Sequence, residues 1–213
     1  MKAAVRTISV EAAVLGKNSA LAEGNRAWLA ERGVSALNLV SSPGSGKTTL
    51  LERTIRESGR AICVIEGDQA TSRDADRIRA AGAAAVQINT GAGCHLDAAM
   101  IARALPALDP PRGSLVMIEN VGNLVCPAMF DLGERAKVLV ASVTEGDDKP
   151  LKYPHMFRAA TLVVLSKIDL LPYVPFDRAR FEACVAEVNP QAQILAVSST
   201  TGAGLAAWYA WLA

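Results

Sequence analysis

A run of small residues between two apolar segments has the composition of a phosphate-binding turn. Residues 41–48 follow an apolar strand predicted at 37–40 and end in Gly-Lys-Thr, before a helix predicted over 49–57. Successive backbone N–H groups in such a turn point toward an anion at the helix N-terminus. Lys47 can reach the β- and γ-phosphate oxygens, and the Thr48 hydroxyl is placed to ligate Mg²⁺. We therefore predict a nucleotide-phosphate site that uses Gly44, Ser45, Gly46, Lys47, Thr48 and Thr49.

The first position of this motif departs from the usual pattern, because Ser41 stands where glycine is expected. We expect Pro43 and Gly44 to make the bend instead. The alternative is an ordinary strand-to-helix turn.

Acidic residues follow two of the predicted strands. Asp68 comes shortly after the strand at 61–65, and Glu119 directly follows the strand at 115–118. Asp68 is the candidate for placing or deprotonating an attacking water, with Lys47 as its catalytic partner. The alternative for Asp68 is a turn or a cap on the helix predicted from residue 72. We predict that Thr48, Asp68 and Glu119 hold Mg²⁺, and that the backbone N–H of Gly122 contacts the γ-phosphate.

A third strand end predicts recognition of guanine. Residues 166–169 are similar to the N-K-x-D signature, with Ser166 in the Asn position. The Asp169 carboxylate can accept hydrogen bonds from N1–H and from the 2-amino group, donors that adenine lacks there. We expect the Lys167 stem to lie along the base, and Ser166 to lose a tie to the phosphate loop. A backbone N–H near Ser198 and Ser199 could donate to guanine O6. The alternative is a solvated pair of strand-end charges.

Thiol and imidazole groups form a separate constellation. Cys94 and His95 follow a Gly-Ala-Gly run, and Cys126 lies four residues after Gly122. These donors suit Zn²⁺ and Ni²⁺ better than Mg²⁺, and they do not distinguish the first two. We expect the start of a helix to favour a Cys94 thiolate. Three ligands do not close a structural site, so the site is predicted to be open or shared.

The position of Cys126 on the loop of Gly122 means that nucleotide state could move a metal ligand. The alternative is two buried thiols and a capping histidine. We expect Cys63 and Cys184 to be small core residues, and His155 to lie on the surface.

The elements that must position these groups alternate between strand and helix. Nearly continuous apolar strands separated by helices predict an α/β fold, a mostly parallel sheet with helices on both faces. Ligands of such sheets bind at the carboxyl ends of strands. Apolar spacing predicts a further helix at 10–29, which ends before Gly33. We expect an N-terminal helical extension over 1–35, packed on a P-loop domain over 36–213. The expected helices after the phosphate loop are 49–57, 72–81, 96–105, 176–188 and 205–212, and the expected strands are 61–65, 84–88, 115–118, 138–143, 162–165 and 194–197.

Composition narrows the class further. The chain has 213 residues, a hydrophobic content of 51%, four cysteines and a net charge of +1. No Lys/Arg run is long enough to follow a nucleic-acid backbone, so we expect no nucleic-acid partner. No stretch approaches the ~18 apolar residues of a membrane span, and the first residues do not resemble a secretory leader. We expect a cytoplasmic protein with no membrane partner, whose cysteines are thiols or ligands.

Taken together, the motifs resemble the HypB family, the GTPases that deliver nickel during [NiFe]-hydrogenase maturation. The resemblance runs from about Asn18 to the C-terminus. It is carried by residues 41–48, 66–68, 91–97, 119–127, 144–154 and 166–172. Many members have a Cys-rich or His-rich N-terminal nickel segment, and the printed sequence contains neither.

The resemblance implies a P-loop fold of the class that dimerises around nucleotide. It implies a metal site of Cys94, His95 and Cys126 at that dimer interface, and a role for Lys149 or Lys152 across it. The implied cofactors are GTP, Mg²⁺ and either Ni²⁺ or Zn²⁺. The implied partners are a second copy of the chain, a second nickel chaperone and the hydrogenase large subunit precursor.

We therefore expect a GTPase that acts as a nickel metallochaperone, in which hydrolysis times the release of metal. Three alternatives stay open. The chain could be a metal-binding module that uses nucleotide only structurally. It could be the related urease-maturation GTPase, whose metal motif resembles Cys-Pro-His. It could also be a partition-type or reductase-type ATPase of the same fold.

Overall fold

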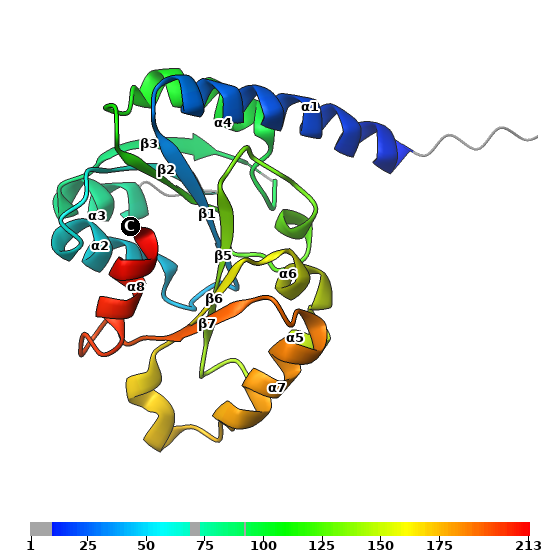
Figure 1. The fold of residues 1–213 in the computed structure, drawn as a ribbon, viewed down its shortest axis with the longest axis vertical. Coiled ribbons are helices and arrows are strands. Elements are labelled where there is room, and N and C mark those ends of the chain that lie inside the picture. Colours follow the sequence, from blue (N-terminus) through cyan, green and yellow to red (C-terminus); the bar gives the residue numbers. More distant parts are fainter. Residues whose placement is uncertain (1–9, 69–72, 92) are drawn as a thin grey trace, which may run out of the picture.

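The protein folds around one parallel sheet of seven strands. A computed structural model describes residues 10–68, 73–91 and 93–213 (Figure 1). The strand order is β3-β2-β4-β1-β5-β6-β7, and every neighbouring pair is parallel. The predicted α/β class is thus confirmed. The strands are β1 (Ser35–Ser41), β2 (Ile62–Asp68), β3 (Ala84–Asn89), β4 (Leu115–Glu119), β5 (Ala136–Ser142), β6 (Leu162–Ser166) and β7 (Gln193–Ala196).

Helices cover both faces of the sheet. On one face α2, α3 and α8 bury side chains such as Leu50, Ile78 and Trp208 (Figure 1). On the other face α1 and α4 cover one half of the sheet, and α6 and α7 cover the other half. Because the central strands are covered twice, their residues form continuous buried apolar runs. The helices are α1 (Val10–Glu31), α2 (Lys47–Glu57), α3 (Arg73–Ala81), α4 (Ala98–Leu108), α5 (Lys149–Lys152), α6 (Pro154–Ala159), α7 (Arg178–Val188) and α8 (Leu205–Leu212), with 3-10 turns η1 (Cys126–Ala128) and η2 (Ile168–Tyr173).

The register of the central strands brings the predicted site residues to one edge of the sheet. In β1, Leu39 lies beside Glu119 of β4, which in turn lies beside Glu66 of β2. Since β1 leads directly into the phosphate loop, these carboxyl ends surround its mouth.

Two helices begin later than the apolar spacing predicted. The Asp97 side chain accepts a hydrogen bond from Met100 N at 2.7 Å and caps α4, which therefore begins at Ala98 instead of residue 96. Asp177 caps α7 in the same way, accepting from Arg180 N at 3.0 Å. The predicted start of α3 at residue 72 lies outside the described residues, as does the loop at 69–72.

Helix α1 lies along α4 and is joined to it by buried amides (Figure 1). The Asn18 side chain accepts from Ala98 N at 2.8 Å and donates to Asp131 O at 2.7 Å. Asn25 donates to the carbonyl oxygens of Ala98 and Leu132. The helix is therefore fastened to the start of α4 and to the loop before β5. None of the described helices is long and apolar enough to cross a membrane.

Candidate nucleotide and metal sites

The predicted phosphate loop has the backbone expected of an anion-binding turn. Gly44 and Gly46 adopt φ angles of +76° and +96°, which other residues tolerate poorly. Ser41, in the unusual first position, has a direct use: its hydroxyl accepts a hydrogen bond from Lys47 Nζ at 3.0 Å. The bend thus lies at the glycines, while Ser41 holds the lysine ammonium.

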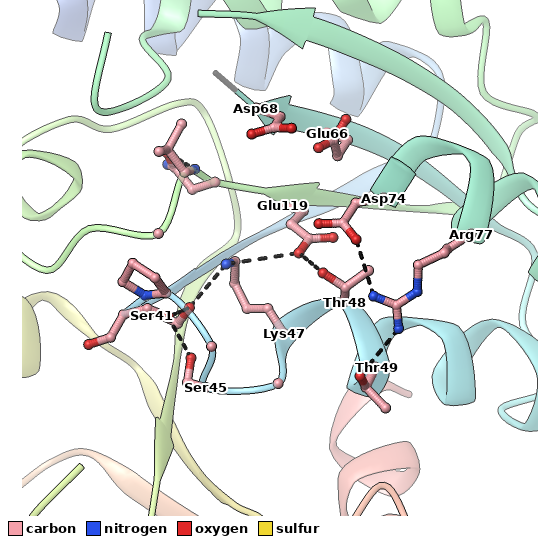
Figure 2. Close-up of a pocket in the computed structure, with 18 of the residues that line it drawn as sticks. Ser41, Ser45, Lys47, Thr48, Thr49, Glu66, Asp68, Asp74, Arg77 and Glu119 are labelled. Atoms are coloured by element: carbon pink, nitrogen blue, oxygen red, sulfur yellow. Dashed lines mark hydrogen bonds and ion pairs between the residues drawn. The ribbon is translucent and has the colours of Figure 1, made fainter. Parts of the chain in front are cut away.

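The loop forms one wall of a cavity of about 540 Å³ (Figure 2). Thr48 Oγ1 donates to Glu119 Oε1 at 2.6 Å, and Lys47 Nζ lies 3.9 Å from the same oxygen. A hydroxyl and a carboxylate are therefore already paired where a cation and a triphosphate would lie. The lining includes all of the predicted phosphate-loop residues, from Gly44 to Thr49, together with Asp68, Glu119, Gly122 and Lys167.

Four carboxyl groups face this cavity, two more than the motifs predicted. Figure 2 shows Glu66 and Asp68 across the cavity from the phosphate loop, Asp74 paired with Arg77, and Glu119 bonded to Thr48. Burial raises the pKa of Glu119, and burial, followed by the charges of Glu119 and Asp68, raises the pKa of Glu66 to about 8. One oxygen each of Glu66 and Glu119 is buried without a hydrogen-bond partner among the described residues. Such orphaned acceptors fit a bound cation and its water shell.

The sequence did not indicate Glu66 as a site residue, because it indicated Asp68, two positions later, as the acidic residue after this strand. Both side chains leave β2 on the same face, since side chains alternate along a strand. The in-register pairing of Glu66 with Glu119 was the missing information.

Glu66 gives a prediction about pH. A carboxyl group whose pKa is higher in the folded than in the unfolded protein contributes stability that is fully present below its pKa in the unfolded protein. This stability is lost as the pH rises through its pKa in the folded protein. Glu66→Gln is therefore expected to raise the melting temperature of the nucleotide-free protein relative to wild type by at least about 3 °C at pH 8.5, with little difference at pH 5. Melting curves across this range test it. The exposed Glu187→Gln should show no such trend, and a constant Glu66→Gln difference would contradict the assignment.

Gly122 of the β4 loop lies against the phosphate loop. A Cβ on Gly122 would come within 3.0 Å of the Pro43 backbone. The close approach of these two loops therefore depends on a glycine, which is consistent with the predicted γ-phosphate contact.

The guanine-loop expectation for Ser166 was wrong. The Ser166 hydroxyl donates to Ser45 O at 2.6 Å, so the serine provides a tie to the phosphate loop that we expected to be lost. Lys167 adds a second tie, from Nζ to Gly44 O at 2.7 Å. Both contacts fasten the loop after β6 to the loop after β1.

Asp169 and the loop after β7 lie beside each other. Ile168 N donates to Val197 O, and one Asp169 carboxylate oxygen is buried without a partner among the described residues. Within the second loop the N–H of Ser198 already donates to Ala203 O, so Ser199 is the better candidate for contacting guanine O6. The guanine site stays a prediction.

The thiol and imidazole groups converge. One ligand atom each of Cys94, His95 and Cys126 lies within 4.8 Å of the others. The Cys94 thiol donates to Cys126 Sγ at 3.1 Å, and His95 Nδ1 lies 3.6 Å from Cys94 Sγ. The His95 ring also packs on Phe130, with 4.1 Å between ring centroids. All three ligand residues are partly exposed, so the cluster is accessible from outside.

The expected thiolate at a helix start was wrong. Cys94 lies three residues before the Asp97 cap, and its pKa is raised by the hydrogen bond to Cys126 and by burial. Burial lowers the pKa of His95, which favours the neutral ring that a metal requires. The two shifts favour the neutral thiol of Cys94 and the neutral ring of His95.

Hydrogen bonds join the loop that carries Cys94 and His95 to the loop that follows β4. Asn123 Nδ2 donates to Cys94 O at 3.2 Å, and Leu96 N donates to Asn120 Oδ1 at 3.1 Å. Leu96 also fills the space beside Gly67 of β2, where a Cβ would lie 2.8 Å from its side chain. The loop after β4, which lines the nucleotide cavity and carries Cys126, is therefore hydrogen-bonded to the loop that carries Cys94 and His95.

The remaining candidates do not belong to the group of metal-ligating side chains. Cys63 and Cys184 are buried, and His155 is exposed, as predicted. Lys149 is paired with Glu145, and Lys152 with Asp148 at 2.8 Å, within the same chain. A role for either lysine across an interface stays a prediction.

The fold and the phosphate loop define a P-loop nucleotide-binding domain. A family model described as "CobW/HypB/UreG, nucleotide-binding domain" matches residues 35–196. The hydrogenase maturation factor HypB of Escherichia coli (strain K12) is 58% identical to this chain, over 97% of this chain and 72% of the relative. The hydrogenase maturation factor HypB of Rhizobium leguminosarum bv. viciae is 59% identical, over 97% of this chain and 70% of the relative. The chain belongs to the HypB family.

Solved structures agree with this assignment. The hydrogenase maturation factor HypB from Archaeoglobus fulgidus has a TM-score of 0.85 at 42% identity, covering 92% of this chain and 97% of that one. HypB from Helicobacter pylori in complex with nickel has a TM-score of 0.87 at 40% identity, covering 92% and 93%. A signal recognition particle 54 kDa protein from Aeropyrum pernix, at 16% identity and a TM-score of 0.56, shares the fold alone, over 78% of this chain and 42% of that one.

Proposed function

We propose that this protein is a GTP-hydrolysing nickel metallochaperone for [NiFe]-hydrogenase maturation. The observation that carries the proposal is the convergence of Cys94, His95 and Cys126, because Cys126 lies on the loop after β4 whose first residues line the nucleotide cavity. Relatives that are named hydrogenase maturation factors, and a related structure in complex with nickel, support it.

In the proposed reaction, a water oxygen attacks the γ-phosphorus and the bond from that phosphorus to the β,γ-bridging oxygen breaks. GDP leaves with the bridging oxygen, and the released phosphate keeps the water oxygen and takes up its proton. Asp68 orients the water, while Lys47 and the backbone N–H groups of the phosphate loop stabilise the developing charge. Thr48, Asp68 and Glu119 would hold Mg²⁺, which would neutralise charge on the β- and γ-oxygens when bound. Asp169 and Lys167 select guanine.

In the proposed delivery step, the γ-phosphate holds Gly122 against Pro43 and so fixes the loop that leads to Cys126. Loss of the phosphate relaxes this loop and changes the position of Cys126 relative to Cys94 and His95. A nickel ion held by the two thiolates and the imidazole then leaves as cargo toward its acceptor.

A single chain offers three donors, which leaves a coordination position for another group. We propose that a second copy of the chain shares the metal when GTP is bound. A second nickel chaperone and the hydrogenase large subunit precursor are the proposed acceptors.

The experiment is to measure nickel content and oligomeric mass of the protein loaded with GDP and with a non-hydrolysable GTP analogue. We expect a monomer with GDP, and a dimer with bound nickel in the GTP-analogue state. Identical mass and nickel content in both states, together with absent GTP turnover, would instead favour a metal-binding module that uses nucleotide structurally.

The preference for guanine over adenine distinguishes the proposed GTPase from an ATPase of the same fold. Asp169→Asn replaces an acceptor of two guanine hydrogen bonds by an amide, so the preference for GTP over ATP in kcat/KM is expected to fall by about 100-fold or more. Turnover assays with both nucleotides test this, with the exposed Asp76→Asn as the control. Unchanged GTP and ATP turnover would contradict the assigned role of Asp169.

A further inference from the structure

Four buried polar side chains, Asn120, Asn38, Glu134 and Lys137, are linked to one another in the interior near the metal cluster. Asn120 Nδ2 donates to Asn38 Oδ1 at 3.2 Å, and Asn38 Nδ2 donates to Glu134 Oε1 at 3.1 Å. Glu134 Oε1 lies 3.9 Å from Lys137 Nζ. Asn38 and Asn120 are 0% and 1% exposed, and the Glu134 and Lys137 side chains are 6% and 8% exposed. None of these four residues belongs to the metal-ligand set.

The two ends of this row of side chains contact the two loops that carry the metal-ligand residues, one with Cys94 and His95 and the other with Cys126. At one end, Asn120 Oδ1 accepts from the N–H of Leu96, the residue after His95. At the other end, Lys137 Nζ donates to Pro127 O at 2.7 Å and to Phe130 O at 3.1 Å. Pro127 follows Cys126 directly, and Phe130 packs on the His95 ring.

The middle of this row of side chains lies on the strand that leads to the phosphate loop. Asn38 is in β1, three residues before Ser41, and it is in register with Lys137 of β5. Asn120 also donates its backbone N–H to Leu39 O, and it lies two residues before Gly122. One set of hydrogen bonds and an ion pair therefore contacts β1, the loop that carries Gly122 and Cys126, and the loop that carries Cys94 and His95.

Burying an ammonium, a carboxylate and two amides costs free energy that an apolar core of the same shape would avoid. Once they are buried, each partner is held by the others, because an unpaired polar group there is strongly disfavoured. A displacement of Asn120 toward or away from the nucleotide must therefore be accommodated by both loops.

We propose that Asn120, Asn38, Glu134 and Lys137 form a positioning relay that sets the spacing of Cys94, His95 and Cys126 according to the state of the Gly122 loop. The proposal rests on the proposed nucleotide-dependent delivery of nickel and names the side chains that would transmit it. The four act as positioning residues: Asn120 lines the nucleotide cavity, and none of the four belongs to the metal-ligand set.

The test compares the ratio of Ni²⁺ affinities in the GTP-analogue and GDP states, measured with full-length protein. Asn38→Leu removes the central link, because a leucine side chain neither donates nor accepts a hydrogen bond. We expect the ratio to fall to within about twofold of one, and the thiolate-to-nickel absorption band to become the same in both states. Asn189→Leu is the matched control, because the Asn189 amide holds three carbonyl groups near α7, away from both sites, and should keep the wild-type ratio.

A wild-type ratio retained in Asn38→Leu would overturn the relay and leave the proposed function intact. A ratio of one in wild type itself would overturn the coupling in the proposed function, and the relay with it. If Asn38→Leu fails to fold, Lys137→Met keeps the aliphatic stem, removes the link to Pro127 and Phe130, and is expected to lower the ratio in the same way.

Discussion

Cys126→Ser is expected to lower the affinity for Ni²⁺ by at least about 100-fold, since even groups that only support a ligand change metal affinity by about 10- to 100-fold. Cys126 Sγ lies 3.1 Å from Cys94 Sγ, so the change removes one of two thiolates from a set of three donors. A hydroxyl is a much poorer ligand for this ion than a thiolate. Titration with Ni²⁺, followed by the thiolate-to-nickel absorption band, measures the effect.

The matched control is Cys184→Ala, which removes a buried thiol on α7 away from the cluster. It should keep the wild-type Ni²⁺ affinity despite a lower melting temperature. Nucleotide binding should be retained in Cys126→Ser, because the phosphate loop does not include this residue. Equal Ni²⁺ affinities of Cys126→Ser and wild type would show that the cluster is not the metal site.

Lys47→Ala is expected to lower kcat/KM for GTP by at least about 100-fold, the loss typical of removing one group that stabilises charge in the transition state. The lysine is the cation that Ser41 and Glu119 hold at the mouth of the phosphate loop. Its removal also leaves Glu119 buried without its neighbouring positive charge, which should weaken the stability of the nucleotide-free protein. Phosphate release assays measure the rate.

Lys17→Ala, an exposed change on α1, is the control for loss of one positive charge. Lys47→Ala is also expected to affect the nucleotide site and the metal site differently. Lys47→Ala should still bind Ni²⁺, but its affinity should no longer depend on whether GTP or GDP is added. GTP turnover at the wild-type rate in Lys47→Ala would contradict the assigned phosphate site.

Much of the fold could be predicted because its signals are local. Buried strands such as β4 and β6 are short apolar runs, and the helix after the phosphate loop follows from a glycine turn and apolar spacing. Helices α5 and α6 were missed because they have only 4 and 6 residues, too few for a periodic pattern. Their starts are nevertheless marked by Pro150 and Pro154 in the first turn.

The site was predicted less evenly than the fold. Motifs named the residues of the phosphate loop and of the metal cluster, but no motif reports which carboxylates share a strand edge, and so Glu66 was missed. Ser166 was misjudged because a hydroxyl can reach Ser45 O only if the two loops are close, which is a tertiary fact. The linked side chains of Asn120, Asn38, Glu134 and Lys137 come from two strands and two loops, and no sequence spacing indicates their contacts.

The most direct test of the account is the Ni²⁺ affinity of wild-type protein, measured by competition with a chelator, once with GDP and once with a non-hydrolysable GTP analogue. We expect dissociation constants that differ by at least about tenfold, because the loop of Gly122 and Cys126 changes position with the γ-phosphate. Equal dissociation constants in the two states would contradict it.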